Sequence, residues 1–401
     1  MAILLINRFS NEKIPFSELL KDSQEELILL TANEQIDTYD KGYAYVEGFN
    51  NFDNNAQVEF RAIELSKSYN FSSIVVTSEY DINRTARLRE KLGVQGQGIR
   101  SASAFRDKII MKEYAQAVVE VPNFRRIKTP FDIYDFLSDY GFPIVIKPID
   151  GSGSINTYIL KDQNELNIFL ENGKFQGFEI EEYIQGDMYT VDGLYQDGEV
   201  LFSWPGRYVN DCLSFHDGKQ ASNVQLAESN PLYNRLQQFI QELITSMPMP
   251  KVTPFHAEVF HTSDNRLVLC EIASRTGGGC MNELAQFKFG VNLNHAWVQG
   301  QCGLVSELNL VRNDKIFGFV QIPPRKGKLL SIPKEVPFHW VVNYQIRAEI
   351  GMINDSINNS ADKIAVSVVE GKTEEEVVAR MDLITKWVED NCIWETNWQY
   401  I

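Results

Sequence analysis

Hydrophobic residues in this chain gather in short apolar runs, and these runs alternate with longer stretches in which apolar residues recur every three or four positions. The runs have the length of β-strands and include Ala2–Ile6, Leu27–Leu30 and Ser73–Thr77. No internal repeat is visible. Alternation of this kind predicts an α/β or α+β architecture.

Three of the longer stretches carry signals that place helix ends. Thr129 to Asp132 combine an N-cap, a proline at the first helical position and an acid two residues later, and this helix should end at Gly141. Asn230-Pro231 should open a second helix, whose apolar residues keep the helical period as far as Met247. A third should follow the capping box Thr373–Glu376.

Composition narrows the class of protein. A chain of 401 residues suits two or three packed domains, and 44% hydrophobic with 23% charged residues is typical of a globular protein. The net charge of -16 argues against a nucleic-acid partner and fits an acidic, soluble surface.

The expected compartment is the cytoplasm. The five cysteines are odd in number and lack metal-ligand spacing, so they indicate reduced thiols. Met1–Ile6 runs directly into Asn7 and Arg8, which indicates a first strand rather than a signal peptide. No apolar run approaches the roughly 18 residues of a membrane span, so no membrane partner is expected.

A phosphate-binding loop is the first candidate for chemistry. The strand-like segment 142–148 ends in Lys147 and leads into Gly151–Ser154. Glycines let backbone amides approach phosphate oxygens, serines add hydroxyl donors, and the lysine supplies a cation. The alternative is a solvated lysine and an ordinary flexible turn. The chain lacks G-x-x-x-x-G-K-[ST], and Gly93–Gly98 has the wrong spacing for a dinucleotide fingerprint.

A pair of carboxylates is the second candidate. Strand-like runs 255–261 and 267–272 flank the turn residues 263–266, and a turn centred on Asp264-Asn265 places Glu258 directly opposite Glu271. Like charges so placed are destabilising unless a divalent cation binds between them, and Mg²⁺ suits oxygen ligands shared with phosphates. A water-separated pair or a slipped register is the alternative. The opposite, apolar face should consist of Phe255, Ala257, Val259, Val268, Cys270 and Ile272.

Polar residues near this hairpin extend the candidate site. Arg275 follows the second acid and could clamp phosphate or carboxylate, or instead form a structural salt bridge. His256 should hydrogen-bond next to the carboxylates rather than touch substrate. The polar loop 210–223 could be a lid or an exposed connection.

In type and in order, these motifs resemble those of the ATP-grasp superfamily over nearly the whole chain. The segment 105–112 looks like the one that opens the family's ATP-grasp domain, and segment 179–184 looks like its hinge strand. By resemblance, the residues that bind the nucleotide are Lys108, Lys147, Gly151, Ser152, Gly153, Ser154, Glu181, Glu182 and Ile184. Resemblance also assigns Glu258 and Glu271 to Mg²⁺, with Mn²⁺ as the alternative metal, and makes Arg275 the catalytic arginine.

The resemblance implies an ATP-grasp fold in three parts. Residues 1–105 would form an N-terminal open-sheet α/β domain. Residues 106–310 would form a two-lobed ATP-grasp domain, with 106–185 as the first lobe and 186–310 as the second. Residues 311–401 would form a C-terminal α+β lobe.

Two positions depart from the family pattern. Ala273 stands where many relatives have a metal-binding asparagine, and Met188 stands where many have a ribose-binding glutamate. Water could replace the first group, and Asp187 is a candidate for the second role. Amino-acid ligases of the family often carry this alanine, so Ala273 does not imply inactivity.

The implied function is a ligase that uses ATP to activate a carboxylate, most simply that of an amino acid, as an acyl phosphate. An amine is the preferred acceptor, which gives small-molecule carboxylate and amine substrates. One alternative acceptor is the thiol of an acyl carrier protein, and a further alternative is a non-catalytic ATP-binding module. Relatives suggest a homodimer, which no residue pattern here demonstrates.

Overall fold

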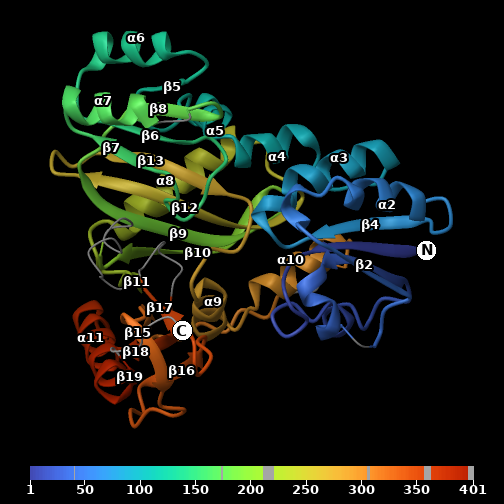
Figure 1. Cartoon of the computed structure of the whole chain (residues 1–401). Coiled ribbons are helices and arrows are strands. Elements are labelled where there is room, and N and C mark those ends of the chain that lie inside the picture. Colours follow the sequence, from blue (N-terminus) through green and yellow to red (C-terminus); the bar gives the residue numbers. More distant parts are fainter. Residues whose placement is uncertain (40, 173–174, 211–220, 305–307, 356–362, 396–401) are drawn as a thin grey trace.

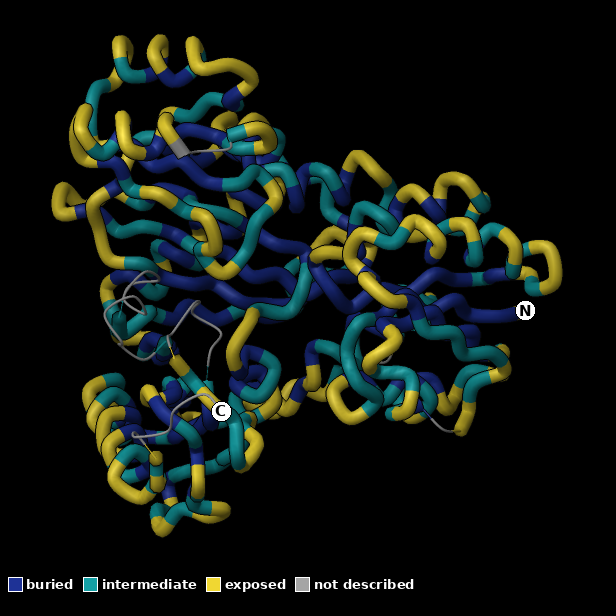
Figure 2. Tube along the Cα trace, in the orientation of Figure 1, coloured by how far each residue is buried: buried dark blue, intermediate teal, exposed yellow. Residues whose placement is uncertain are grey.

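The computed structural model describes residues 1–401 except 40, 173–174, 211–220, 305–307, 356–362 and 396–401. Figure 1 shows a mixed arrangement of sheets flanked by helices, with the N-terminal sheet at the right and the C-terminal segment at the lower left. Buried residues follow the strands of each sheet, whereas exposed residues follow the outer helix faces and the loops (Figure 2). The α/β architecture predicted from the sequence is confirmed.

The N-terminal sheet is parallel, with strand order β3-β2-β1-β4. Its central strands are almost continuously apolar because helices and loops cover both faces. All three predicted strands are present. The strands are β1 (Ala2–Asn7), β2 (Glu26–Ala32), β3 (Tyr45–Phe49) and β4 (Phe71–Val76). The helices of this region are α1 (Phe16–Leu19), α2 (Gln57–Leu65), α3 (Ile82–Leu92) and the 3₁₀ turns η1 (Asn33–Thr38), η2 (Phe52–Asn54) and η3 (Glu79–Asp81).

Two helices, α4 (Ile99–Arg106) and α5 (Lys108–Ala115), lead from this region into an antiparallel sheet of order β5-β8-β6-β7. Helices α6 (Pro130–Tyr140) and α7 (Gln163–Asn172) cover one side of it (Figure 1). The strands are β5 (Phe124–Arg126), β6 (Ile144–Pro148), β7 (Tyr158–Leu160) and β8 (Phe178–Glu182). The predicted capping box of α6 is formed by Thr129 and Asp132.

A larger antiparallel sheet, of order β13-β12-β9-β10-β11-β14-β18-β16, joins the middle of the chain to its C-terminal part. Because β11 pairs with β14, this sheet crosses the boundary predicted at residue 310. Its strands are β9 (Gly186–Gln196), β10 (Glu199–Tyr208), β11 (Ala221–Gln225), β12 (Val252–Thr262), β13 (Leu267–Ala273), β14 (Ile316–Ile322), β16 (Val341–Ile346) and β18 (Ala365–Gly371).

Helices pack on this sheet and against the N-terminal one. The helix α8 (Tyr233–Ser246) buries its periodic apolar face against β9, β12 and β13. It begins three residues after Asn230, because the Asn230 side chain accepts a hydrogen bond from the Leu232 amide and holds a turn first. The other helices are α9 (Met281–Phe289), α10 (Leu293–Gln301), which packs beside β4, and α11 (Glu374–Asn391), which is capped by Thr373 as predicted.

A small antiparallel sheet completes the C-terminal part, with β15 (Gly327–Ser331) between β17 (Ile353–Asn354) and β19 (Ile393–Glu395). Cys270, Cys280, Cys302 and Cys392 are free thiols, and Cys212 lies outside the described residues. Within the described part of the chain, no helix is both long enough and apolar enough to cross a membrane.

Candidate active site

The hairpin of β12 and β13 places Glu258 directly opposite Glu271, as the sequence predicts. Two local features differ from that prediction and cancel each other. The turn is one residue shorter, because the Thr262 amide donates to the Arg266 carbonyl oxygen (3.0 Å), and a bulge at Cys270 then restores the register. The two glutamates therefore face the same side of the sheet.

The shorter turn and the bulge overturn two assignments to the predicted apolar face, those of Val268 and Cys270. Val268 lies opposite Phe260, on the side of the sheet that carries the two glutamates. Leu269 takes the place expected for Cys270 and packs, fully buried, in the core with Phe255 and Val259. Cys270 instead lies where it interacts electrostatically with Lys147, and burial raises the pKa of its thiol. The assignment of Cys270 to the apolar face was wrong because an extra residue in one strand reverses which way its neighbours point.

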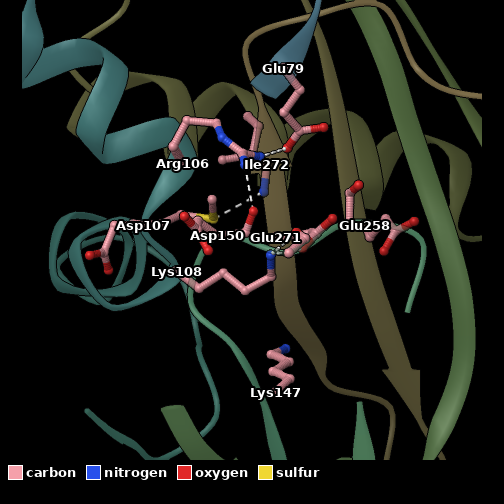
Figure 3. A network of polar contacts seen from close by, with 12 residues as sticks. Glu79, Arg106, Asp107, Lys108, Lys147, Asp150, Glu258, Glu271 and Ile272 are labelled. Atoms are coloured by element: carbon pink, nitrogen blue, oxygen red, sulfur yellow. Dashed lines mark hydrogen bonds and ion pairs between the residues drawn. The ribbon is translucent and has the colours of Figure 1, made fainter. Parts of the chain in front are cut away.

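Each of the two glutamates has its own polar partners. The Tyr208 hydroxyl donates to Glu258 Oε1 (2.9 Å), and His256 Nε2 lies 3.5 Å from the same oxygen. Glu271 Oε2 lies 3.0 Å from the Lys108 ammonium, and Figure 3 shows this lysine reaching across from its helix. Burial would raise the pKa of Glu271, but Lys108 and other nearby cations outweigh it and lower the pKa to about 2.

Lys108 is the first residue of α5, and the helix cap fixes its position. The Asp107 side chain accepts hydrogen bonds from the amides of Ile109 and Ile110, which starts the helix at Lys108. The Lys108 ammonium donates a hydrogen bond to the Gly151 carbonyl oxygen (2.8 Å) and also lies close to Glu271. Two predicted motifs, the opening lysine and the glycine loop, therefore meet at the metal-ligand candidates.

Lys147 lies in a buried network of two lysines and two glutamates. Its ammonium is 2.5 Å from Glu181 Oε1 and 3.8 Å from Glu179 Oε1. The Lys112 ammonium, fully buried, is 2.8 Å from Glu179 Oε1 and 2.5 Å from Glu181 Oε2. Burial alone would lower the pKa of Lys147, but the carboxylates hold that pKa well above its usual value. In Figure 3 the Lys147 ammonium points toward the Lys108–Glu271 pair.

The hinge candidates lie at the end of β8. Ile184 is buried, and the Glu182 carboxylate accepts a hydrogen bond from the Asn123 side chain (2.9 Å). The Glu181 carboxylate points instead into the lysine network. The structure thus separates Glu181 and Glu182 onto opposite faces of the strand, as alternation in a strand requires.

The glycine loop is tied to the N-terminal part of the chain. Gly153 and Ser154 have left-handed backbone angles, with φ of 64° and 57°. The hydroxyls of Ser152 and Tyr80 lie 2.5 Å apart, and Tyr80 belongs to η3 next to the N-terminal sheet. The loop therefore turns sharply and contacts the turn that follows β4.

Arg275 forms a salt bridge with Glu79, which was the alternative to a role in clamping phosphate or carboxylate. Its Nε lies 2.6 Å from Glu79 Oε2, while Arg106 Nη1 donates to Glu79 Oε1 at 2.5 Å. Arg106 also donates to the Asp150 carbonyl oxygen, just before the glycine loop (Figure 3). One carboxylate from the N-terminal part thus orients two arginines beside the site.

His256 hydrogen-bonds beside the carboxylates, as predicted. Its Nδ1 lies 2.8 Å from Asp192 Oδ1, and both side chains are buried. Burial opposes a charge on the ring, but Asp192 and Glu258 outweigh it and raise the pKa of His256 to about 10. Gly277 is needed here, because a Cβ at that position would lie 2.6 Å from Asp192 Oδ1.

Several residues of the site were missed at the sequence level, namely Glu79, Arg106, Lys112, Glu179, Asp192 and Tyr208. Local signals existed for two of them. Lys112 follows Lys108 by four positions, so both lie on one helix face, and Glu179 precedes Glu181 by two positions on one strand face. Arg106 lies two residues before Lys108, but spacing does not indicate its partner Glu79, which lies 27 positions away. Asp192 and Tyr208 also lie outside the predicted motifs.

The donor set fits a hard divalent cation that is also bound by substrate. Among the described residues, no group of three His, Cys, Asp or Glu side chains could enclose a metal ion. Glu258 and Glu271 nevertheless lie directly opposite each other on neighbouring strands, and Mg²⁺ commonly takes one or two carboxylates with phosphate and water oxygens. These two residues would hold the metal, and its chemistry would be charge neutralisation at phosphate.

The remaining candidates lie at the edges of this arrangement. Ala273 is buried opposite His256, and Met188 pairs with Phe260 farther along the same strands. Asp187 is exposed near the start of β9. Of the polar loop 210–223, residues 211–220 lie outside the described part of the chain, and Ser222 is buried in β11.

Comparison with known proteins shows which proteins this chain resembles. Residues 140–283 match the ATP-grasp domain family. The chain is 25% identical over 343 residues to an L-arginine-specific L-amino acid ligase of Bacillus subtilis, covering 82% of each chain. It is 31% identical over 186 residues to a D-alanine–D-alanine ligase A of Bacillus cereus, covering 45% of this chain and 60% of that protein.

Solved structures agree on the fold. The crystal structure of an L-amino acid ligase from Bacillus licheniformis superposes with a TM-score of 0.79 at 17% identity, covering 98% of this chain and 99% of the other. The matched segment contains Lys147, the glycine loop and both opposed glutamates. Residues 140–283 therefore match an ATP-grasp domain, and the chain as a whole is similar to amino acid ligases.

Proposed function

We propose that this chain is an ATP-dependent ligase that activates the carboxylate of an amino acid as an acyl phosphate and joins it to an amine, releasing ADP and phosphate. The observation that carries the proposal is the pair Glu258–Glu271, which faces a cluster of basic residues. The relatives named as amino acid ligases support the choice of an amino acid and an amine as substrates.

The charges around the site support a metal-bound nucleotide. Five basic side chains are within ion-pair distance of a carboxylate, and five carboxylates face the same region. The basic members are Arg106, Lys108, Lys112, Lys147 and Arg275, and the acidic members are Glu79, Glu179, Glu181, Glu258 and Glu271. The cluster is formally neutral, so a triphosphate needs an additional cation, and Mg²⁺ bound by the two opposed glutamates supplies it.

The nucleotide would lie between the hinge and the glycine loop. Lys108 and Lys147 would contact phosphate oxygens, and residues Gly151 to Ser154 would cover them with backbone amides and hydroxyls. The backbone at Glu182 and Ile184 would frame the adenine, while Glu181 would act through Lys147. The division of the chain at 105, 185 and 310 stays a prediction.

The reaction then proceeds in two displacements. A carboxylate oxygen of the first substrate attacks the γ-phosphorus of ATP, and ADP leaves with the electron pair of the broken P–O bond. The amine nitrogen of the second substrate attacks the acyl carbon, and phosphate leaves. Lys147, Lys108 and Arg275 would stabilise the charge that develops, because they are already oriented by carboxylates.

The experiment is to measure ADP and phosphate release with Mg-ATP across amino acids supplied singly and in pairs. Release that needs a pair of amino acids is the expected result. Release that requires a phosphopantetheinylated carrier protein instead would assign a thiol acceptor. Tight ATP binding with no ADP formed under any mixture would contradict the ligase proposal and leave a nucleotide-binding module.

A further inference from the structure

We propose that Lys112 is a positioning residue for ATP: it neutralises the buried carboxylates Glu179 and Glu181, so that the Lys147 ammonium keeps its place for the phosphates. Lys112 itself is fully buried and does not need to touch the nucleotide. The inference rests on the proposed function, because it assigns Lys147 to phosphate.

The geometry makes the two lysines unequal. Lys112 contacts both carboxylates closely, with 2.8 Å to Glu179 Oε1 and 2.5 Å to Glu181 Oε2. Lys147 contacts Glu181 at 2.5 Å but lies 3.8 Å from Glu179. Glu179 therefore belongs mainly to Lys112, and Glu181 is shared by both lysines through separate oxygens.

Burial makes each charge in this network dependent on the others. Glu179 is fully enclosed, and Glu181 and Lys147 are 5% and 7% exposed. Buried ions that lose a partner are strongly disfavoured, because water cannot replace it. Without Lys112, two carboxylates would face Lys147 alone, and its ammonium would be drawn from the phosphate side toward Glu179.

Local structure sets the spacing of these residues on each element, and the packed fold brings the elements together. Lys112 lies one helical turn after Lys108 on α5, so the same helix presents one lysine to Glu271 and the other to the β8 carboxylates. Glu179 and Glu181 are two residues apart on β8, so their side chains share one face of the sheet. Lys147 lies on the neighbouring strand β6 and is paired with Glu179. The Phe124 ring packs 5.4 Å from the Lys112 ammonium.

The proposal predicts different effects on nucleotide binding for substitutions of the two partners of the Lys112–Glu179 contact. Lys112→Met keeps the length and volume of the side chain but removes its charge. Glu179→Gln keeps the shape of its partner and removes the opposite charge. If Lys112 only holds the fold together, both substitutions should act alike, whereas a role in freeing Lys147 makes only the first one weaken nucleotide binding.

The experiment is calorimetric titration of each purified variant with ADP and Mg²⁺, which requires no turnover, together with its melting temperature. Lys112→Met should raise the dissociation constant for ADP at least about tenfold, which corresponds to about 1.4 kcal/mol. Glu179→Gln should leave it unchanged or lower. The double variant, in which one lysine again faces one carboxylate, should return to within about threefold of the wild-type protein.

Lys147→Met serves as the reference for the proposed function. If that variant binds ADP as well as the wild-type protein, the phosphate assignment of Lys147 fails, and the inference fails with it. If Lys147→Met binds weakly while Lys112→Met binds normally, only the inference is overturned. Equal weakening by Lys112→Met and Glu179→Gln, or a double variant as weak as Lys112→Met, also overturns it. If Lys112→Met does not fold, Glu179→Gln alone decides: weakened binding contradicts the proposal.

Discussion

The carboxylate of Glu79 joins the N-terminal part of the chain to Arg106 and Arg275 of the candidate site, and its removal is expected to lower the stability of the fold. Glu79→Gln keeps the side-chain shape but replaces one oxygen by an amide nitrogen. In the native structure Arg106 Nη1 and Arg275 Nε lie 2.5 and 2.6 Å from the two oxygens. The variant can accept a hydrogen bond from one arginine but presents a donor to the other.

The magnitude follows from burial. The Glu79 side chain is 10% exposed, and those of Arg106 and Arg275 are 6% and 17% exposed. Removing one partner of a buried ion pair costs about 3–5 kcal/mol, since the remaining charge loses its compensation without regaining water. Burial would raise the pKa of Glu79, but Arg275 and Arg106 outweigh it and lower that pKa. The stability it contributes is therefore present above the ordinary carboxyl pKa and is lost as pH falls through the lowered value.

An exposed ion pair in the same chain provides the control. Glu120 pairs with Arg266, and both side chains are 44% exposed. Glu120→Gln should cost less than about 1 kcal/mol, because solvent screens such pairs. Urea unfolding followed by tryptophan fluorescence at neutral pH gives both free energies. If Glu79→Gln lost no more stability than Glu120→Gln, the assignment of a tightly coupled Arg–Glu–Arg group would be refuted.

Three other predictions test the site at separate points. Glu271→Ala should abolish ADP formation while leaving the far-ultraviolet circular dichroism spectrum unchanged, and near-normal turnover would contradict the metal assignment. His256 has a folded-state pKa of about 10, raised mainly by Asp192 against the opposing effect of burial, so its stabilisation is complete below the unfolded pKa of about 6.5 and lost as pH rises toward 10. The free energy of unfolding of the wild-type protein should therefore decrease as pH rises from about 6.5 to about 10, and that of Asp192→Asn should decrease much less. Parallel pH profiles for the two proteins would exclude this coupling. Tyr80→Phe removes the hydroxyl next to Ser152 and should raise the KM for ATP a few-fold with little change in kcat, and an equal loss in a Ser152→Ala background would show that the two hydroxyls are not coupled.

The sequence predicted local elements and the opposed carboxylates well because both depend on short-range periodicity. The capping box of α6, the strand ending at Lys147 and the Glu258–Glu271 pairing follow from spacing within a few residues. The bulge at Cys270 was not predictable in this way. The shorter turn and the extra strand residue shift the register in opposite directions, so Glu258 and Glu271 stay opposed. The correct prediction of this pair therefore gave no indication of either feature.

The partners of the basic residues could not be predicted from spacing. Glu79 and Arg275 are separated by 196 positions, and Lys112 and Glu179 by 67, so only the packed fold brings them together. The single signal at Glu79 was its place just after β4, at the carboxyl end of a parallel strand. Ligand sites of open parallel sheets lie at such ends, but that general tendency does not select one side chain.

The way in which the basic residues are held explains why three parts of the chain must be correctly placed for this site to form. Lys108 from α5 is oriented by Glu271 in β13, Lys147 in β6 by Glu181 in β8, and Arg275 by Glu79 beside the N-terminal sheet. Preorganised charges stabilise a transition state without reorganising during the reaction. Because each carboxylate belongs to a different strand or turn from the cation that it orients, a displacement of any one part changes the direction of a cation. The same pairs that stabilise the packed fold thereby set the direction of the cations that we propose for the phosphates.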